Sequence, residues 1–164
     1  MKRITKEERA LAFCIAFFPP LWAVVAPHLG VSTGAVALIC AGLYVANGNE
    51  VKDGVSMSIG FLMGDLWAVL ALKIMEYLPW NADITLYITL FVLGAMAVIL
   101  AAFLPKLIYC PAMLCGWAIG LTIMAPIGIA NIGSLPFQIG TAMLIGVWYV
   151  GFGVDWVQKK ILRK

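Results

Sequence analysis

The sequence predicts an all-α integral membrane protein with six transmembrane helices, arranged as an inverted repeat of three plus three. Apolar residues make up 63% of the 164-residue chain and charged residues only 12%, which is far from the composition of a soluble domain. The charges gather at the two ends and in short loops, with six apolar runs between them. A seven-residue stretch, Gly54–Gly60, has a near copy at Gly140–Gly146. These observations favour a bilayer as the natural solvent and a duplicated chain.

The near copy belongs to a longer self-match at a constant offset of 86 residues. Thirteen identical pairs join positions 16–73 to their partners, and five of these pairs are glycines. Glycine positions depend on close backbone approach or special dihedral angles, so matched glycines indicate a true repeat. We interpret the chain as one membrane domain, 1–164, with repeat halves near 10–74 and 96–160. The alternative is a chance match in a chain rich in Ala, Gly, Leu and Ile.

The first half contains three predicted spans. The first is Ala10–Ala26, a 17-residue apolar run near the lower limit for crossing a bilayer. The second is a short helix that Ser32 or Thr33 caps and that ends near Val45. The third is the long run Gly54–Ile74, after a polar loop.

The second half repeats this order. Its spans are Ile84–Phe103, a helix with Pro111 in its first turn that reaches about Ala130, and Phe137–Trp156. The Asn131–Pro136 loop separates the last two.

Two prolines occupy matching places in the repeat. Pro19 begins the Pro19-Pro20 pair near the middle of the first span, where proline removes a backbone donor and is expected to kink or break the helix. Freed carbonyls are not tolerated against lipid, so the break is expected to face protein or a wet cavity near the solute pathway. Pro105 is its partner 86 residues later, and it also has the simpler interpretation of a helix end.

Basic residues at the chain ends predict the orientation: Lys2, Arg3, Lys6, Arg9, Lys159, Lys160, Arg163 and Lys164. Cytoplasmic segments are enriched in Lys and Arg, so both termini are expected in the cytoplasm and the number of spans is even. Three spans in each half then invert the second half relative to the first. Such halves are related by a pseudo-two-fold axis in the membrane plane, which places a solute site near the midplane between them.

Asp65 is the one acidic residue that the sequence places deep within a predicted span. A lone carboxylate at that depth costs about 2.5–3.5 kcal/mol on insertion scales, so we expect it to face the bundle interior and to pair, bind a cation or stay protonated. A direct role in permeation is one interpretation. The other is a structural hydrogen bond to a neighbouring helix backbone or to Trp67, Ser58 or Tyr149.

Four further polar residues are candidates for the solute pathway: Ser56, Ser58, Asn47 and Asn131. The two asparagines follow alanines after the second and the fifth span, at nearly matching places. An amide offers a donor and an acceptor together, which suits a neutral polar solute. Asparagine at a helix end is ordinarily a cap, and that interpretation stays open.

Two glycine pairs, Gly60 with Gly64 and Gly116 with Gly120, are each spaced by four residues and so share a helix face. Small residues at this spacing permit close helix contact, either within the chain or between subunits. Because six partly short helices form a thin bundle, we expect a homo-oligomer, a dimer or a trimer.

Several function classes are excluded by what the sequence lacks. It contains no Walker loop, no Rossmann fingerprint and no paired carboxylates. One histidine and four cysteines beside apolar runs provide no apparatus for hydrolysis or metal binding. We therefore expect no enzyme, no cofactor, no metal site and no nucleic-acid partner, and we expect the lipid bilayer and a small polar or cationic solute as partners.

The predicted function is a small-solute membrane channel or simple carrier, with its site at the interface of the two inverted halves. The absence of a nucleotide-binding motif favours passive transport. The alternative is a non-transporting membrane assembly or scaffold subunit.

In its length, basic ends, six short apolar spans and high glycine content, the chain resembles the YcdZ-like family of small, poorly characterised bacterial inner-membrane proteins. The resemblance covers the whole chain and rests on this general pattern. It implies a multi-pass protein of the bacterial inner membrane and assigns no functional residues.

Overall fold

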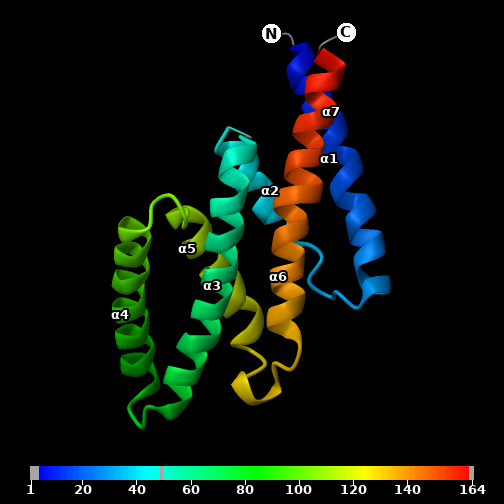
Figure 1. The fold of residues 1–164 in the computed structure, drawn as a ribbon. Helices are drawn as coiled ribbons and strands as arrows, with labels where there is room; N and C mark the ends of the chain where they lie inside the picture. Colours follow the sequence, from blue (N-terminus) through cyan, green and yellow to red (C-terminus); the bar gives the residue numbers. More distant parts are fainter. Residues whose placement is uncertain (1–3, 49, 163–164) are drawn as a thin grey trace. The chain divides into compact units, whose positions relative to one another are not determined.

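The computed structural model describes residues 4–48 and 50–162, and over these residues the regular structure is helical (Figure 1). The chain forms two compact units. The terminal unit comprises Met1–Gly54 and Thr141–Lys164, and the central unit comprises Val55–Gly140. Helices α3 (Val51–Tyr77) and α6 (Leu135–Ile145) each cross from one unit to the other.

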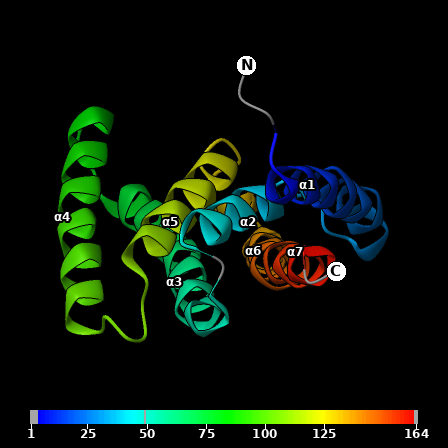
Figure 2. The ribbon, with the colours of Figure 1, turned by 90° about the horizontal axis from the view of Figure 1, so that it is seen from above.

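The terminal unit contains both ends of the chain. Its elements are α1 (Lys6–Val25), the 3-10 helix η1 (Ala26–Leu29), α2 (Val36–Ala46), the π-helix η3 (Gly146–Phe152) and α7 (Gly153–Leu162). Helix α1 lies beside α7 and η3, and α2 packs on η3 (Figures 1 and 2). The buried cluster that joins these helices consists of Cys14, Ala41, Val150 and Val154.

Helix α1 begins before the predicted apolar run because a capping box starts it. The Thr5 side chain accepts from the Glu8 backbone N–H at 3.1 Å, and the Glu8 carboxylate accepts from the Thr5 N–H at 2.7 Å. The helix continues through Pro19 and Pro20 to Val25, so the prediction of a break is wrong there, and the alternative of a kink stays a prediction. Each proline removes one N–H donor, and the remaining hydrogen bonds of the ladder are enough to keep the helix continuous.

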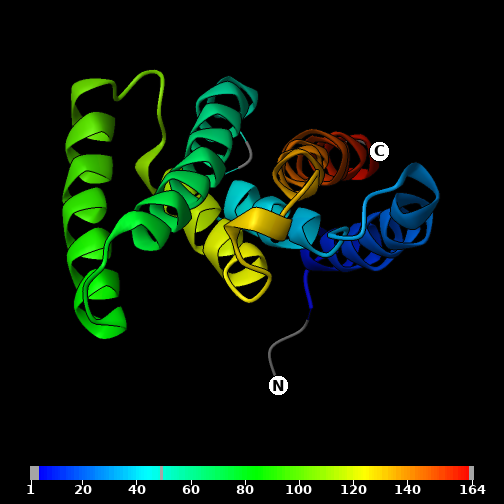
Figure 3. The same cartoon turned by 90° about the horizontal axis from the view of Figure 1, so that it is seen from below.

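The central unit contains most of α3, α4 (Ala82–Phe103), α5 (Cys110–Met124), the 3-10 helix η2 (Ile129–Asn131) and the start of α6 (Figure 3). One face of α4 is buried at every fourth residue: Thr85, Thr89, Leu93, Ala97 and Ala101. The apolar part of this face packs with Ile108 and Met113, and with Ile59, Met63 and Trp67 of α3.

Four helical stretches of the described residues are long and apolar enough to cross a membrane: Glu8–Leu29, Val51–Tyr77, Ala82–Phe103 and Leu135–Val157. Helices α2 and α5 are apolar but shorter. The six predicted apolar helices are therefore present as helices, and two of them, α2 and α5, are too short to span a bilayer straight.

Several helix ends differ from the predicted ones. Helix α2 starts at Val36 with Ala35 at its N-cap, so neither Ser32 nor Thr33 caps it. Helix α5 ends at Met124 rather than near Ala130, because Pro126 follows and Gly128 turns the chain with φ 78°. Pro105 lies just beyond the end of α4, as its simpler interpretation has it.

Helices α3 and α5 approach so closely that their backbones touch. A methyl group on Gly60 would lie 2.7 Å from the Tyr109 carbonyl oxygen, and one on Gly64 would overlap the Met113 carbonyl oxygen. From the other side, a methyl group on Gly116 would overlap the Phe61 carbonyl oxygen. The two glycine pairs therefore lie at one helix crossing inside the chain.

Helix α2 meets η3 in the same way within the terminal unit. A methyl group on Gly146 would overlap the Ala37 carbonyl oxygen, and one on Gly151 would lie 2.6 Å from the Tyr44 ring. The two glycines are five residues apart, the spacing of the π-helical hydrogen bond, and the wide turn of this helix brings both towards α2.

Gly64→Ala is expected to destabilise the protein by about 1–3 kcal/mol, because the added methyl group forces the α3 and α5 backbones apart. The measurement is the thermal midpoint of the purified, single-sized protein in one detergent. Gly42→Ala in α2 is the matched control, since a methyl group there meets nothing within 4 Å and alanine favours the helix. Equal midpoints for Gly64→Ala and the unaltered protein would contradict the expectation.

Candidate functional site

Asp65 lies near the middle of α3, about 20 Å from either end at a rise of about 1.5 Å per residue. Its side chain is buried, with the residue 4% exposed. The carboxylate oxygen Oδ1 has no hydrogen-bond partner in the described part of the chain. A buried acceptor without a partner is uncommon in folded proteins and calls for an explanation.

The carboxyl group of Asp65 packs against α5. Asp65 follows Gly64 directly, so the close α3–α5 approach that Gly64 permits also carries Asp65 into the helix contact. Its Oδ1 lies 3.1 Å from the place where a Gly120 methyl group would stand, and Ala68 lies beside the same glycine. Gly120 thus leaves the space that the carboxyl group faces.

The structural hydrogen bond from Trp67 that the sequence left open is not made. The Trp67 indole Nε1–H donates to the Leu93 carbonyl oxygen of α4 at 3.0 Å. This bond ties α3 to α4 and leaves the Asp65 carboxyl group to other partners.

Three more buried polar atoms of the central unit lack partners, and sequence reasoning missed all three. They are Oγ1 of Thr85, Oγ1 of Thr89 and Nε1 of Trp117. The burial of the threonines could have been predicted from the sequence, since they lie four residues apart and continue the apolar face of α4.

Two of the predicted pathway residues precede Asp65 on α3. Ser58 is buried and lies seven residues before Asp65, on the same helix face. Ser56 is half-buried, and its carbonyl oxygen accepts from the Tyr109 N–H at 3.2 Å.

The structure places the two predicted asparagines at helix termini. Asn47 is the C-cap residue of α2, and its amide donates to the Asp53 carboxylate at 3.0 Å in the terminal unit. Asn131 is exposed at the end of η2 in the central unit. Their positions suit the capping interpretation, and a role in a pathway stays a prediction.

A second buried acid escaped the sequence analysis because it lies near the end of the last apolar run. Asp155 of α7 is 6% exposed, and Lys159 donates to its Oδ2 at 2.7 Å one turn further along. This acid has a cationic partner, unlike Asp65.

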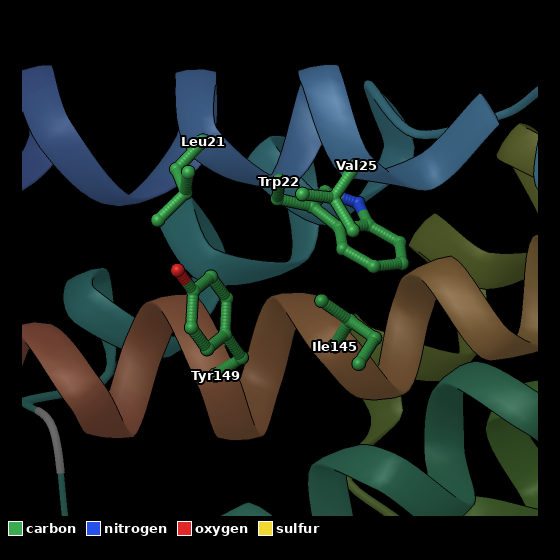
Figure 4. A pocket seen from close by; sticks show the side chains of 5 residues that line it. All are labelled: Leu21, Trp22, Val25, Ile145 and Tyr149. Carbon is green, nitrogen blue, oxygen red and sulfur yellow. The ribbon is translucent and has the colours of Figure 1, made fainter. Parts of the chain in front are cut away.

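The terminal unit also contains an apolar pocket of about 310 Å³ between α1 and η3 (Figure 4). Leu21, Trp22 and Val25 of α1 face Ile145 and Tyr149 across it, and the Tyr149 hydroxyl points towards Leu21. The indole N–H of Trp22 is not available to a ligand in the pocket, since it donates to the Gly34 carbonyl oxygen at 3.1 Å. The pocket therefore offers a hydrocarbon lining.

Metal chemistry finds no support in the described residues. No three His, Cys, Asp or Glu side chains come together in a group that suits a metal ion. The four cysteines form no disulfide within the described residues, and Cys14 and Cys40 are fully buried while Cys110 and Cys115 are half-buried.

Comparison with known proteins gives a family without a known activity. A family model described as a protein of unknown function, DUF1097, matches residues 12–159. No curated protein matches the chain. No solved structure matches it either.

Lys159→Met is expected to lower stability by about 1 kcal/mol, because it leaves the buried Asp155 carboxylate without its cation while Lys159 itself is largely exposed. Adding Asp155→Asn to Lys159→Met should recover most of the loss. The thermal midpoints of the two variants and of the double variant form the cycle that measures this pair. Additive effects of the two substitutions would show that the pair does not couple.

Proposed function

Because the chain belongs to the DUF1097 family of proteins of unknown function, we propose its function from its own residues: a passive membrane channel or simple carrier for a small polar or cationic solute. Asp65 is the residue of the pathway that contacts the solute. The observation that carries the proposal is the buried, unpartnered Oδ1 of Asp65 halfway along a helix long enough to cross a membrane. The proposal includes no enzyme activity and no cofactor.

The energetic argument starts from the cost of this arrangement. An acidic side chain at the bilayer centre costs about 2.5–3.5 kcal/mol, much of it from hydrogen bonds to water that are lost and not replaced. A solute that donates hydrogen bonds or carries positive charge supplies the missing partner. An anion is disfavoured, since Lys73 and Lys106, the lysines of the described central unit, are both exposed.

The inverted repeat of three plus three is part of the proposal. In support, the short helix of each half packs on the long third helix of the other, α5 on α3 and α2 on η3. Both contacts run parallel and both depend on glycines, of which Gly60 and Gly146 are partners at the offset of 86 residues.

Two further contacts are related to each other by the same offset of 86 residues. In the terminal unit, a methyl group on Gly54 would meet the Trp148 ring at 3.1 Å. In the central unit, one on Gly140 would meet Leu62 at 3.1 Å. Gly140 is the partner of Gly54, and Trp148 is the partner of Leu62, which favours a two-fold relation over a chance self-match.

The proposed topology has six membrane helices, with α2 and α5 as the short ones, and both termini in the cytoplasm of a bacterial cell. Reporter fusions in the inner membrane test it: a reporter active only in the cytoplasm is expected to work at either end, and one placed after Leu78 is expected to fail. The physical reason is the basic residues at both ends. Termini on opposite sides would refute the even number of spans, and with it the inversion.

The rival is a non-transporting assembly or scaffold subunit, which the tight glycine contacts of both units favour. A homo-oligomer, dimer or trimer, is compatible with either function. Flux measurements separate the two, because a scaffold gives none.

Asp65→Asn is expected to insert and assemble normally and to lose most of the solute flux, because the amide keeps size and hydrogen bonding but removes the negative charge. The measurement is a flux screen in liposomes across small neutral and cationic solutes, with small anions included for comparison. Glu50→Gln, an exposed residue between α2 and α3, is the control and should leave flux unchanged.

Retained flux in Asp65→Asn with the same solute preference would reduce Asp65 to a structural residue. No flux of any solute through the unaltered protein would favour the scaffold function.

A further inference from the structure

We propose that the terminal unit binds one anionic phospholipid along the seam between α1 and the segment formed by η3 and α7. An acyl chain occupies the apolar pocket, and the headgroup phosphate lies at Lys160. Both sides of the seam belong to stretches that are long and apolar enough to cross a membrane, so a bilayer surrounds them with lipid. The proposal goes beyond the proposed solute function and does not depend on it.

The pocket has the size and the lining that a hydrocarbon chain needs. Its volume is about 310 Å³, and the side chains around it are Leu21, Trp22, Val25, Ile145 and Tyr149 (Figure 4). An engineered apolar cavity of about 150 Å³ in another protein stays dry and binds benzene, so this pocket has room for a larger apolar group. An acyl chain in it makes the dispersion contacts that a gap between side chains forfeits.

The pocket has its mouth on α1. Leu21 is 44% exposed and Val25 is 39% exposed, whereas Trp22 is only 7% exposed. Leu21 and Val25 are one helical turn apart, so they form the mouth together and Trp22 forms the inner wall. A chain from the surrounding bilayer can enter here without separation of the helices.

The contacts along the seam place Lys160 on the side of α7 that faces α1. The two helices run in opposite directions (Figure 1). The centroid of the Phe18 ring lies 5.5 Å from that of the Tyr149 ring, and Phe18 also lies 3.7 Å from the place where a Gly153 methyl group would stand. Tyr149 and Gly153 thus both face α1. Lys160 follows Gly153 by seven residues, two helical turns, so it lies on the same face.

The distance from Lys160 to the pocket matches one leaflet of a bilayer. Lys160 lies eleven residues beyond Tyr149, which is about 16 Å at a rise of about 1.5 Å per residue. Half of a hydrocarbon core about 30 Å thick is about 15 Å. A phospholipid with its phosphate at the level of Lys160 therefore extends its acyl chains to the depth of the pocket.

Positive charge gathers at the Lys160 end of the seam. By sequence, residues 2–9 have a net charge of +2 and residues 155–164 have a net charge of +3, whereas the whole chain has only +3. Among the described residues, Lys6, Arg9 and Lys160 are exposed at the neighbouring ends of α1 and α7 (Figure 1). Basic residues next to a membrane helix attract anionic headgroups, so the expected lipid is anionic rather than zwitterionic.

Trp156 and Lys160 form the headgroup side of the site. The Lys160 ammonium group lies 4.8 Å from the centroid of the Trp156 ring, and Trp156 is 55% exposed. The apolar stretch ends at Val157, so this pair lies at its border, where tryptophan is typical of the lipid–water interface. The neighbouring Lys159 is paired with Asp155, which leaves Lys160 as the cation for the phosphate.

Native mass spectrometry of the full chain, purified in a non-ionic detergent, tests the headgroup contact with dipalmitoyl phosphatidylglycerol and dipalmitoyl phosphatidylcholine. The acyl chains are the same, and only the headgroup charge differs. We expect the phosphatidylglycerol adduct to be several-fold more abundant, and Lys160→Gln to lower this preference several-fold because the cation is lost. Lys106→Gln, at an exposed lysine of the central unit, is the control. Equal binding of the two lipids by the unaltered protein, or an unchanged preference in Lys160→Gln, would overturn the proposal.

Val25→Trp tests the pocket in the same measurement, since the larger side chain occupies the space of the acyl chain. It is expected to lower the binding of both lipids several-fold. Val24→Trp is the matched control, because Val24 is 66% exposed and lies outside the pocket lining. Equal binding by the two variants would show that no acyl chain enters the pocket and would refute the site.

The thermal midpoint of each variant without added lipid shows whether it folds. If Val25→Trp does not fold, Val25→Phe and Val24→Phe replace the pair and are judged by the same criterion. Lipid that binds the folded protein raises the midpoint by mass action, so the rise on adding phosphatidylglycerol should be smaller in the Val25 variant than in the Val24 variant. None of these results depends on solute flux, so the lipid site and the transport function fail separately.

Discussion

The close approach of α3 and α5 is the constraint on which the central unit depends. Backbone contact at this crossing requires glycine at Gly60 and Gly64 on one helix and at Gly116 and Gly120 on the other. Asp65 directly follows one of these glycines, so the same contact that packs the unit also buries the carboxyl group. Packing and candidate site are therefore one feature, and a change in the glycines changes both.

Two buried acids of the described residues, Asp65 and Asp155, differ in their partners. Asp155 lies one turn before Lys159, which supplies a cation at 2.7 Å, and this pair accounts for its burial. Asp65 has no such partner, and Trp67, its nearest candidate along α3, gives its N–H to α4. The contrast separates an acid that is paired within the fold from one whose buried oxygen atom has no partner in it.

The π-helix in the terminal unit has a simple geometric role. Helix α3 carries its contact glycines four residues apart, close to one α-helical turn, whereas the contact glycines of η3 are five residues apart. The wider turn brings these two glycines to the same side of the helix, so that Gly146 and Gly151 both face α2.

The sequence by itself determined the helices and the place of Asp65 in the middle of a long one, because long apolar runs interrupted by charged or Pro-containing loops have few other structures available. It also determined that Gly60 and Gly64 permit close contact, since four-residue spacing is a local property of a helix. It did not determine the helix ends at Lys6 and Met124, which depend on a capping box and on how a turn at Gly128 closes.

Only the tertiary structure decided which helices meet. The partner of Gly64 lies some fifty residues away in α5, and no local periodicity identifies it. The unpartnered state of Thr85, Thr89 and Trp117 follows from which face each helix turns inward and from which neighbours then fail to reach them. Local pattern specifies what a segment can do, whereas contacts between distant segments settle which of its polar groups remain without a partner.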